Sequence, residues 1–455
     1  MKPGMRKCLL CYLVISVAVF VSASLSLAAQ AKNVILMIGD GMGPAHVHTA
    51  WLYATRQLGK NLVMTEVMDG GHTAYMVNDT ADSTVTESAA AAVQMATGVK
   101  VLARSVGIGP DGKTLKTILE MARERGKATG LVTTSGITDA TPAGFFAHVE
   151  KRSEEEKIAA QLVKSDVNIL LGGRKGFFLP EAEKGKRKDG KNLLIEARQN
   201  GYAVVETAEE MKKAEGRKIL GLFNNGDMLF EIDRMGSTEP SLSEMTSKAI
   251  EVLSQDPDGF FLMVEGGRID HAAHHNDIAA VIHDVMAFDG AIRVAYDFQK
   301  NHPETLLIIT ADHETGGLAI ISYAHAGSDY AGINLKAISE IKASHEKRNK
   351  DLGKDPSPEK IREVIKKYYG IDLKEGEVRM IQENVLTKYD SRHFHYDRDG
   401  SISFALRLHH RIGWVSGSHS AAPLFLWGIG PGSEKIKGWR HNTEVFTIMK
   451  EAYGF

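Results

Sequence analysis

The chain has 455 residues, of which 43% are hydrophobic and 25% are charged, an ordinary composition for a globular protein with one large core or two smaller ones. Its 55 lysines and arginines nearly balance its 57 aspartates and glutamates, and the formal net charge of −2 gives no reason to expect specific binding of nucleic acid or of an anionic membrane. The 18 histidines are more informative, because several stand beside acidic residues and zinc commonly binds imidazole and carboxylate together.

The first thirty residues have the pattern of a targeting segment. Three basic residues precede an apolar run over 9–21, and the small residues up to Ala31 form an A-x-A site for signal peptidase. A membrane anchor is the alternative, but the apolar run is short for crossing a bilayer. Both cysteines lie in this segment, so the mature chain has neither disulfides nor thiolate ligands. We therefore expect a cleaved signal peptide over 1–31, no stable membrane anchor, and a periplasmic or secreted protein.

Short apolar runs alternate with helical patterns along the rest of the chain. This alternation predicts an α/β fold, a three-layer α/β/α arrangement around a central, mostly parallel sheet. The expected strands are 34–38, 129–133, 167–171, 260–264, 305–310 and 424–427. The expected helices are 115–125, 244–254, 278–299 and one near the C-terminus, with Asn442 as its N-cap because Asn accepts hydrogen bonds from free helix amides.

A stretch rich in Lys and Glu over 337–376 differs from its surroundings. Its helical spacing predicts a helical surface insertion, about 325–400 in extent, within a single catalytic domain over 32–455. A disordered linker is the alternative, because such compositions bury little apolar surface.

Acidic residues follow or end three of the expected strands. Asp40, Glu265 and Asp312 each stand at the carboxyl end of an apolar run. In an open parallel sheet that edge is where ligands bind. One acidic residue at a strand end often only begins a turn, but three on one sheet concentrate negative charge that cations would offset. The sequence therefore predicts a metal site at this edge.

Histidines that suit the same site stand near these carboxylates. If a helix begins near Asp270, His274 lies one turn later on the same face, a spacing that suits zinc. Taken alone, this pattern is more often a capped helix start with surface histidines. His313 adjoins Asp312 at a strand end, where both side chains can reach one site, and His419 is a further candidate ligand.

A nucleophile is expected near the alanine-rich run that follows Ser88. The alanines favour helix, so this serine would lie in the first turn, where free amides and the helix dipole favour a bound phosphate. The alternative is that Ser88 only caps a buried helix. Ser83, five residues earlier, is a rival nucleophile.

Seven motifs, taken in their order along the chain, resemble the alkaline phosphatase family. They cover most of the mature chain, from Asn33 to about Gly432, and are VILMIGDGMG, VTESAAAAVQMATGVK, DATPAGFFAHVEKR, LLGGRKGF, VEGGRIDHAAHH, TADHETGG and GSH. Each motif is weak by itself, and their common order makes the match specific. The resemblance implies hydrolysis of small phosphate monoesters at alkaline pH through a phosphoserine intermediate, and a possible homodimer.

The resemblance also implies roles for individual residues. Ser88 would be the nucleophile, and Arg152 would be the planar guanidinium clamp on the phosphate. Eight residues would bind two zinc ions and one magnesium ion. One zinc would be bound by Asp270, His274 and His419, and the other by Asp40, Asp312 and His313. Magnesium, or another divalent ion in its place, would be bound by Asp40, Thr141 and Glu265.

Three further residues would surround these ligands, and they depart from the usual pattern of the family. Glu87 stands where the family usually has Asp, which bears on the orientation of Arg152. Asp139 and His271 combine side chains of bacterial and animal members, which leaves the identity of the third metal open.

The alternatives are a phosphodiesterase or sulfatase of the same superfamily and a non-catalytic metal- or phosphate-binding protein. A sulfatase needs a Cys or Ser in a C/S-x-P-x-R context, which the mature chain lacks. A diesterase usually lacks the arginine clamp, so Arg152 favours monoesters. A protein that only binds would need neither Ser88 nor Arg152.

Overall fold

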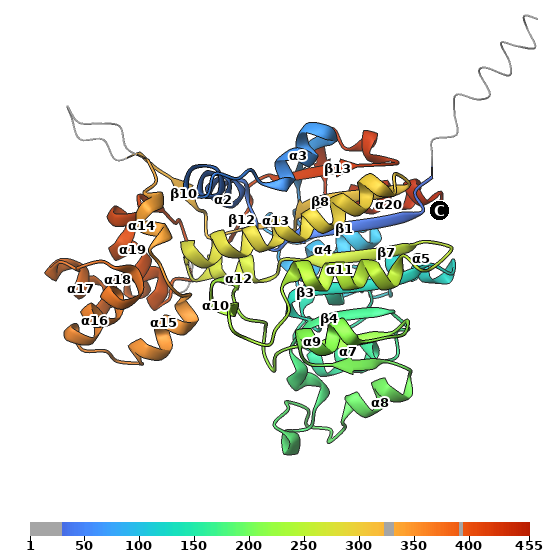
Figure 1. Ribbon diagram of the computed structural model, residues 1–455, viewed down its shortest axis with the longest axis horizontal. Helices are drawn as coiled ribbons and strands as arrows, with labels where there is room; N and C mark the ends of the chain where they lie inside the picture. The colour runs from blue at the N-terminus through green and yellow to red at the C-terminus, as the bar shows by residue number, and fades with distance from the viewer. Residues whose placement is uncertain (1–29, 323–331, 391–394) are drawn as a thin grey trace, which may run out of the picture.

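The computed structural model describes residues 30–322, 332–390 and 395–455 (Figure 1). Nearly all of the expected signal peptide lies outside the described residues. None of the helices in the described ranges combines the length and the apolar character needed to cross a membrane.

A ten-stranded sheet forms the centre of the molecule. In spatial order its strands are β14 (Gly438–His441), β2 (His72–Val77), β13 (Leu424–Ile429), β8 (Thr305–Ala311), β1 (Asn33–Gly39), β7 (Phe260–Glu265), β3 (Ala128–Gly136), β4 (Ile169–Gly173), β6 (Ile219–Leu222) and β5 (Ala203–Val205). All neighbours pair in parallel except β13, which is antiparallel to both β2 and β8. The expected α/β class is therefore confirmed, and β2, β5, β6 and β14 are strands that the sequence patterns did not reveal.

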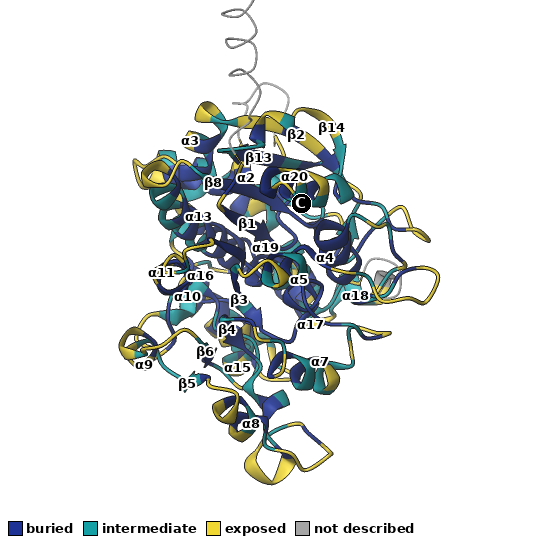
Figure 2. Cartoon of the chain, turned by 90° about the vertical axis from the view of Figure 1, so that its right-hand side faces the viewer, coloured by how far each residue is buried: buried dark blue, intermediate teal, exposed yellow. Residues whose placement is uncertain are grey.

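Helices cover both faces of this sheet, as the view along it shows (Figure 2). On one side lie α3 (Val63–Gly70), α13 (Ile278–Asn301) and α11 (Leu242–Leu253). On the other lie α4 (Ser88–Thr97), α5 (Ile118–Glu124), α7 (Glu155–Leu162) and α20 (Thr443–Tyr453). The central strands β1, β7 and β8 are buried along their whole length, which explains why they are continuous apolar runs.

Asn442 stands at the predicted N-cap position of the last helix, but the capping hydrogen bond expected of its side chain does not form. Asn442 already has helical dihedral angles, φ −61° and ψ −22°, and its side chain makes no capping hydrogen bond. Instead the side chain of Glu444, in the first turn of α20, accepts a hydrogen bond from the His441 amide, 3.0 Å away. A residue inside the helix therefore supplies the hydrogen-bond acceptor for a backbone amide that precedes the helix.

Further helices and strands, most of them short, connect these layers. They are α2 (Pro44–Gln57), α6 (Ala140–Ala143), η1 (Lys175–Phe178), η2 (Glu181–Glu183), α8 (Leu193–Gln199), α9 (Ala208–Lys213), α10 (Glu231–Arg234), α12 (Arg268–His274), β9 (Glu314–Thr315), β10 (Ala319–Ile320), β11 (Ile412–Gly413), β12 (His419–Ser420) and η3 (Ser433–Lys435).

A group of helices projects from one end of the sheet, at the left of Figure 1. They are α14 (Leu335–Ser339), α15 (His345–Leu352), α16 (Pro358–Tyr369), α17 (Glu375–Gln382), α18 (Val385–Asp390) and α19 (Arg398–His410). This helical group has a hydrophobic core of its own, which includes Ile361, Ile365 and Leu406. The same core takes in Tyr53 of α2 and Ile282 of α13, so the helical group is packed onto the main body.

Candidate active site

Three adjacent strands bring carboxylates to one edge of the sheet. β1 lies between β8 and β7, and Asp40, Asp312 and Glu265 stand at the carboxyl ends of these strands. All three side chains are buried. Burial, followed by repulsion from neighbouring carboxylates, raises the pKa of each above its ordinary value. This edge therefore has the concentrated negative charge that a bound cation would neutralise.

Asp40, Asp312 and His313 form the first of three ligand groups, with donor atoms within 4.8 Å of one another. His313 Nε2 lies 3.4 Å from Asp40 Oδ1 and 3.3 Å from Asp312 Oδ2. Neither of these buried oxygens receives a hydrogen bond from the residues that the structure describes. A metal ion would satisfy both oxygens, because carboxylate and imidazole are zinc ligands.

The second group consists of Asp270, His274 and His419. Asp270 and His274 lie one turn apart on α12, as expected, with Oδ2 and Nε2 separated by 3.2 Å. The Nδ1 atoms of His274 and His419 lie 2.6 Å and 3.0 Å from the carbonyl oxygens of Gly417 and Thr86. A carbonyl only accepts, so each Nδ1 carries a proton, and each Nε2 has a free lone pair when the ring is neutral.

These two Nε2 atoms are only 3.1 Å apart. Two lone pairs directed at each other repel, and a cation between them and Asp270 removes the repulsion. The arrangement of the second group therefore fits a metal ion.

The third group contains only oxygen donors. Glu265 ends β7, Asp40 directly follows the neighbouring strand β1, and the negative charge of Glu265 contributes to raising the pKa of Asp40. Thr141, on α6, is buried, and its hydroxyl oxygen has no hydrogen-bond partner among the described residues, so it is free to bind a cation. Oxygen donors alone suit magnesium better than zinc.

Thr315 links the first two groups, a role that sequence reasoning missed. Its hydroxyl donates to Asp270 Oδ1 and lies 3.2 Å from Nδ1 of His313. Because the hydroxyl proton is used on the carboxylate, its oxygen accepts from Nδ1–H, and His313 keeps a free lone pair on Nε2. The position of Thr315, two residues after His313 in the TADHETGG motif, is the only signal in the sequence that could have found it.

Ser88 lies at the first group. Its Oγ is 3.2 Å from His313 Nε2, and the residue is buried at the start of α4. Ser83, the rival, is exposed, and its Oγ accepts a hydrogen bond from the Val85 amide. The geometry therefore favours Ser88 as the nucleophile.

Glu87 caps α4 in front of this serine. Its carboxylate accepts hydrogen bonds from the amides of Ala89 and Ala90, at 3.1 Å and 2.8 Å. The expectation that the first-turn amides of α4 are free for phosphate is therefore wrong for these two, because the longer Glu side chain already uses them.

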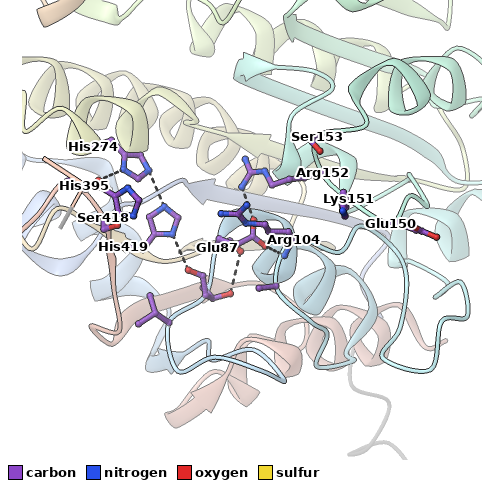
Figure 3. A pocket seen from close by; sticks show the side chains of 14 residues that line it. Glu87, Arg104, Glu150, Lys151, Arg152, Ser153, His274, His395, Ser418 and His419 are labelled. Carbon is purple, nitrogen blue, oxygen red and sulfur yellow. Dashed lines mark hydrogen bonds and ion pairs between the residues drawn. The ribbon is translucent and has the colours of Figure 1, made fainter. Parts of the chain in front are cut away.

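Arg152 is held at both ends of its guanidinium. Nη1 donates to Glu87 Oε2 at 2.8 Å and Nη2 to Asp139 Oδ1 at 3.1 Å. Although burial raises it, the pKa of Asp139 is held well below its usual range by Arg174 and then by Arg152. These bonds fix the plane of the Arg152 guanidinium at the wall of a cavity of about 780 Å³ (Figure 3).

His271 lies beside the site without entering the three ligand groups. Its Nδ1 is 2.8 Å from Arg268 Nη1 and 3.9 Å from a carboxylate oxygen of Asp227. His271 therefore belongs to a network of charged residues around Asp139. Arg174 and Asp227 are two further members of this network that the sequence patterns did not reveal.

Known proteins resemble this chain over almost its whole length. The sequence model of the alkaline phosphatase family matches residues 31–455. Alkaline phosphatase 3 of Bacillus subtilis is 36% identical, covering 91% of this chain and 87% of that protein. The repressible alkaline phosphatase of Saccharomyces cerevisiae is 38% identical, with coverages of 93% and 82%. The crystal structure of Thermus thermophilus alkaline phosphatase superposes with a TM-score of 0.87 at 33% identity, covering 94% and 92% of the two chains.

Proposed function

This chain belongs to the alkaline phosphatase family, and on that premise we propose that it hydrolyses small phosphate monoesters at alkaline pH through a phosphoserine on Ser88. The observation that carries the proposal is the position of Ser88 Oγ, 3.2 Å from His313 Nε2 in the first ligand group. The buried serine hydroxyl stands beside an imidazole and carboxylate oxygens without a hydrogen-bond partner among the described residues, a setting suited to nucleophilic attack once a cation is bound there.

The three ligand groups support a binuclear zinc site with a magnesium ion beside it. Asp270, His274 and His419 would hold one zinc and Asp40, Asp312 and His313 the other. Asp40, Thr141 and Glu265, the oxygen donors beside them, would hold magnesium or another divalent ion. When bound, such ions would supply Lewis-acid stabilisation of the attacking and leaving oxygens and lower the pKa of an oxygen bound to them.

The residues of the chain account for the remaining requirements of the reaction. Ser88 Oγ attacks phosphorus in line, so that its bond to phosphorus forms while the ester P–O bond breaks and the alcohol leaves with a proton. Water then cleaves the phosphoserine, which releases inorganic phosphate and restores the serine. Arg152 binds two non-bridging oxygens through its remaining N–H groups, because Glu87 and Asp139 hold its plane.

The charge on Arg152 favours monoesters over the main alternative, a phosphodiesterase activity. A monoester dianion spreads two negative charges over three non-bridging oxygens, whereas a diester spreads one negative charge over two. We therefore place any diester hydrolysis second to monoester hydrolysis.

The proposal is tested by hydrolysis of 4-nitrophenyl phosphate and bis(4-nitrophenyl) phosphate before and after chelation. We expect faster hydrolysis of the monoester, a rate that rises toward alkaline pH, and loss of activity on chelation. Ser88→Ala should lower the rate by at least about a thousandfold and abolish covalent phosphate labelling, whereas Ser83→Ala should do neither. Full activity of Ser88→Ala would reject the mechanism.

We also propose that the protein is exported and that its mature chain begins after Ala31. The basic, apolar and small-residue regions of 1–31 support this. N-terminal sequencing of the protein recovered outside the cytoplasm should begin at or near residue 32, and an uncleaved exported chain would contradict the proposal.

A further inference from the structure

The cavity beside the proposed phosphate site is lined by two cationic residues, Arg104 and Lys151, in addition to Arg152. Its volume of about 780 Å³ lies in the range of pockets that enclose whole small molecules. Arg104, Lys151 and Arg152 line the side opposite His419. Figure 3 shows Arg104 and Arg152 extending next to each other toward the histidines, whereas Glu150 extends away from them. Glu87, which also lines the cavity, is paired with Arg152, so Arg104 and Lys151 are the cations of the lining that remain beyond the proposed phosphate site.

The backbone of Arg104 is hydrogen-bonded to two residues of the proposed phosphate site, Glu87 and Arg152. Its N–H donates to Glu87 Oε1 at 2.7 Å, and its carbonyl accepts from the Arg152 amide at 3.1 Å. The residue has φ 67°, in the left-handed region that favours glycine. Glycine could make both backbone bonds at a lower conformational cost. The backbone contacts therefore do not account for an arginine side chain at this position.

The Arg104 side chain has no partner among the described residues. Its guanidinium is exposed and forms no hydrogen bond or ion pair there, in contrast to that of Arg152, which binds two carboxylates. A guanidinium is a permanent cation with several N–H donors in one plane. An unpaired guanidinium in a cavity that receives phosphate esters is placed to bind a second anion.

We infer that Arg104, with Lys151 beside it, binds an anionic group on the alcohol part of the substrate. Preferred substrates are then phosphate monoesters that carry a second phosphate or a carboxylate. Arg152 does not serve this second group, because it is fixed by Glu87 and Asp139 for the reacting phosphate. The inference rests on the proposed monoesterase function and adds a substrate class to it.

The preference can be measured by binding without turnover. Calorimetry compares 3-carboxybenzylphosphonate with its uncharged amide, 3-carbamoylbenzylphosphonate, and kcat/KM is measured for the corresponding phenyl phosphates. We expect the native protein to prefer the carboxylate by about fivefold, the strength of a partly exposed ion pair, and to lose the preference in high salt.

Variants of Arg104 separate the side chain from the backbone. Arg104→Gly keeps both backbone bonds, suits the positive φ, and should abolish the preference; Arg104→Lys should retain most of it. Lys184→Gly is the matched control, because Lys184 is an exposed cation with φ 60° outside the cavity, and it should leave preference and rates unchanged.

The outcomes distinguish this inference from the proposed function. Equal binding of the two phosphonates by the native protein, or an undiminished preference in Arg104→Gly, would overturn the role of Arg104. Hydrolysis of neither phenyl phosphate would instead overturn the monoesterase proposal, while a carboxylate preference in binding would still support the anion site.

Discussion

At the scale of single residues, the hydroxyl of Thr315 shows how one side chain can set the state of two ligand groups. It donates to Asp270 and accepts from His313 Nδ1, so it fixes the carboxylate of one group and the tautomer of the imidazole in the other. Because Thr315 is completely buried, solvent water cannot take over the two hydrogen bonds of its hydroxyl.

Thr315→Val keeps the shape of the side chain and removes both hydrogen bonds. We expect about 10- to 100-fold weaker zinc retention, because ligands held by outer hydrogen bonds depend on them to this extent. Zinc per chain, measured by mass spectrometry after dialysis against graded chelator, checks the expectation. Thr315→Ser, which restores the hydroxyl, should behave as the native protein; equal zinc loss in both variants would show that only packing matters.

Arg152→Ala should lower kcat/KM for 4-nitrophenyl phosphate by about a hundredfold, a typical effect of removing one preorganised donor. The loss for bis(4-nitrophenyl) phosphate should be smaller, because a diester carries less charge on its free oxygens. Arg293→Ala, which removes a surface arginine paired with Glu66, serves as the control and should change neither value. Equal losses on both substrates would contradict a role as phosphate clamp.

At the scale of elements, helix α5 is fastened to the chain that follows α6 by one ion pair. His148 Nε2 lies 3.2 Å from Glu120 Oε1, and His148 Nδ1 lies 3.0 Å from the Gly107 carbonyl. The hydrogen bond to Glu120 raises the pKa of His148, against the effect of burial. The stabilisation is therefore complete below the ordinary pKa of 6.5 and is lost as pH rises through the raised value.

His148→Gln should therefore cost more stability at pH 6 than at pH 9. The difference should be at most about 1 kcal/mol, because the pair is partly exposed. Both pH values lie above the range in which Glu120, whose pKa is lowered, takes up a proton, so urea unfolding at these values isolates the histidine. His302→Gln is the control at an exposed histidine. The same loss of stability at pH 6 and pH 9 would contradict the assignment.

The helical group of α14 to α19 depends on its own core for its attachment to the main body. Ile365, on α16, is completely buried in that core. Ile365→Ala should lower the free energy of unfolding by about 2–4 kcal/mol, because it leaves a cavity. Urea denaturation measures the change. Ile195→Ala, at a position that is 54% exposed, is the control, and a loss no larger than that of the control would contradict the packing.

At the scale of the whole molecule, the three ligand groups bring together side chains from segments that are far apart in the sequence, from the end of β1 to β12. A metal ion bound by them stabilises only the folded chain, since the donors are far apart in the unfolded one. Chelation should therefore lower the melting temperature as well as abolish activity, and adding zinc and magnesium should restore both. A melting temperature that chelation leaves unchanged would contradict metal binding at these groups.

The sequence by itself determined the features that depend on neighbouring residues. Buried strands appear as continuous apolar runs, so β1, β7 and β8 and the acidic residues that end them could be predicted. The Asp270 and His274 pair followed from helical periodicity. The resemblance of the motifs to a family then allowed each candidate ligand to be assigned to one of the expected metal sites.

Only the tertiary structure decided the features that depend on distant contacts. The antiparallel direction of β13, the hydroxyl of Thr315 between two ligand groups, and the use of the α4 amides by Glu87 all arise from packing between segments. Local periodicity constrains a segment's own conformation, whereas its neighbours are selected by the packing of the entire chain. For that reason the positive φ of Arg104, and the lack of a partner for its guanidinium among the residues that the structure describes, became visible only in three dimensions.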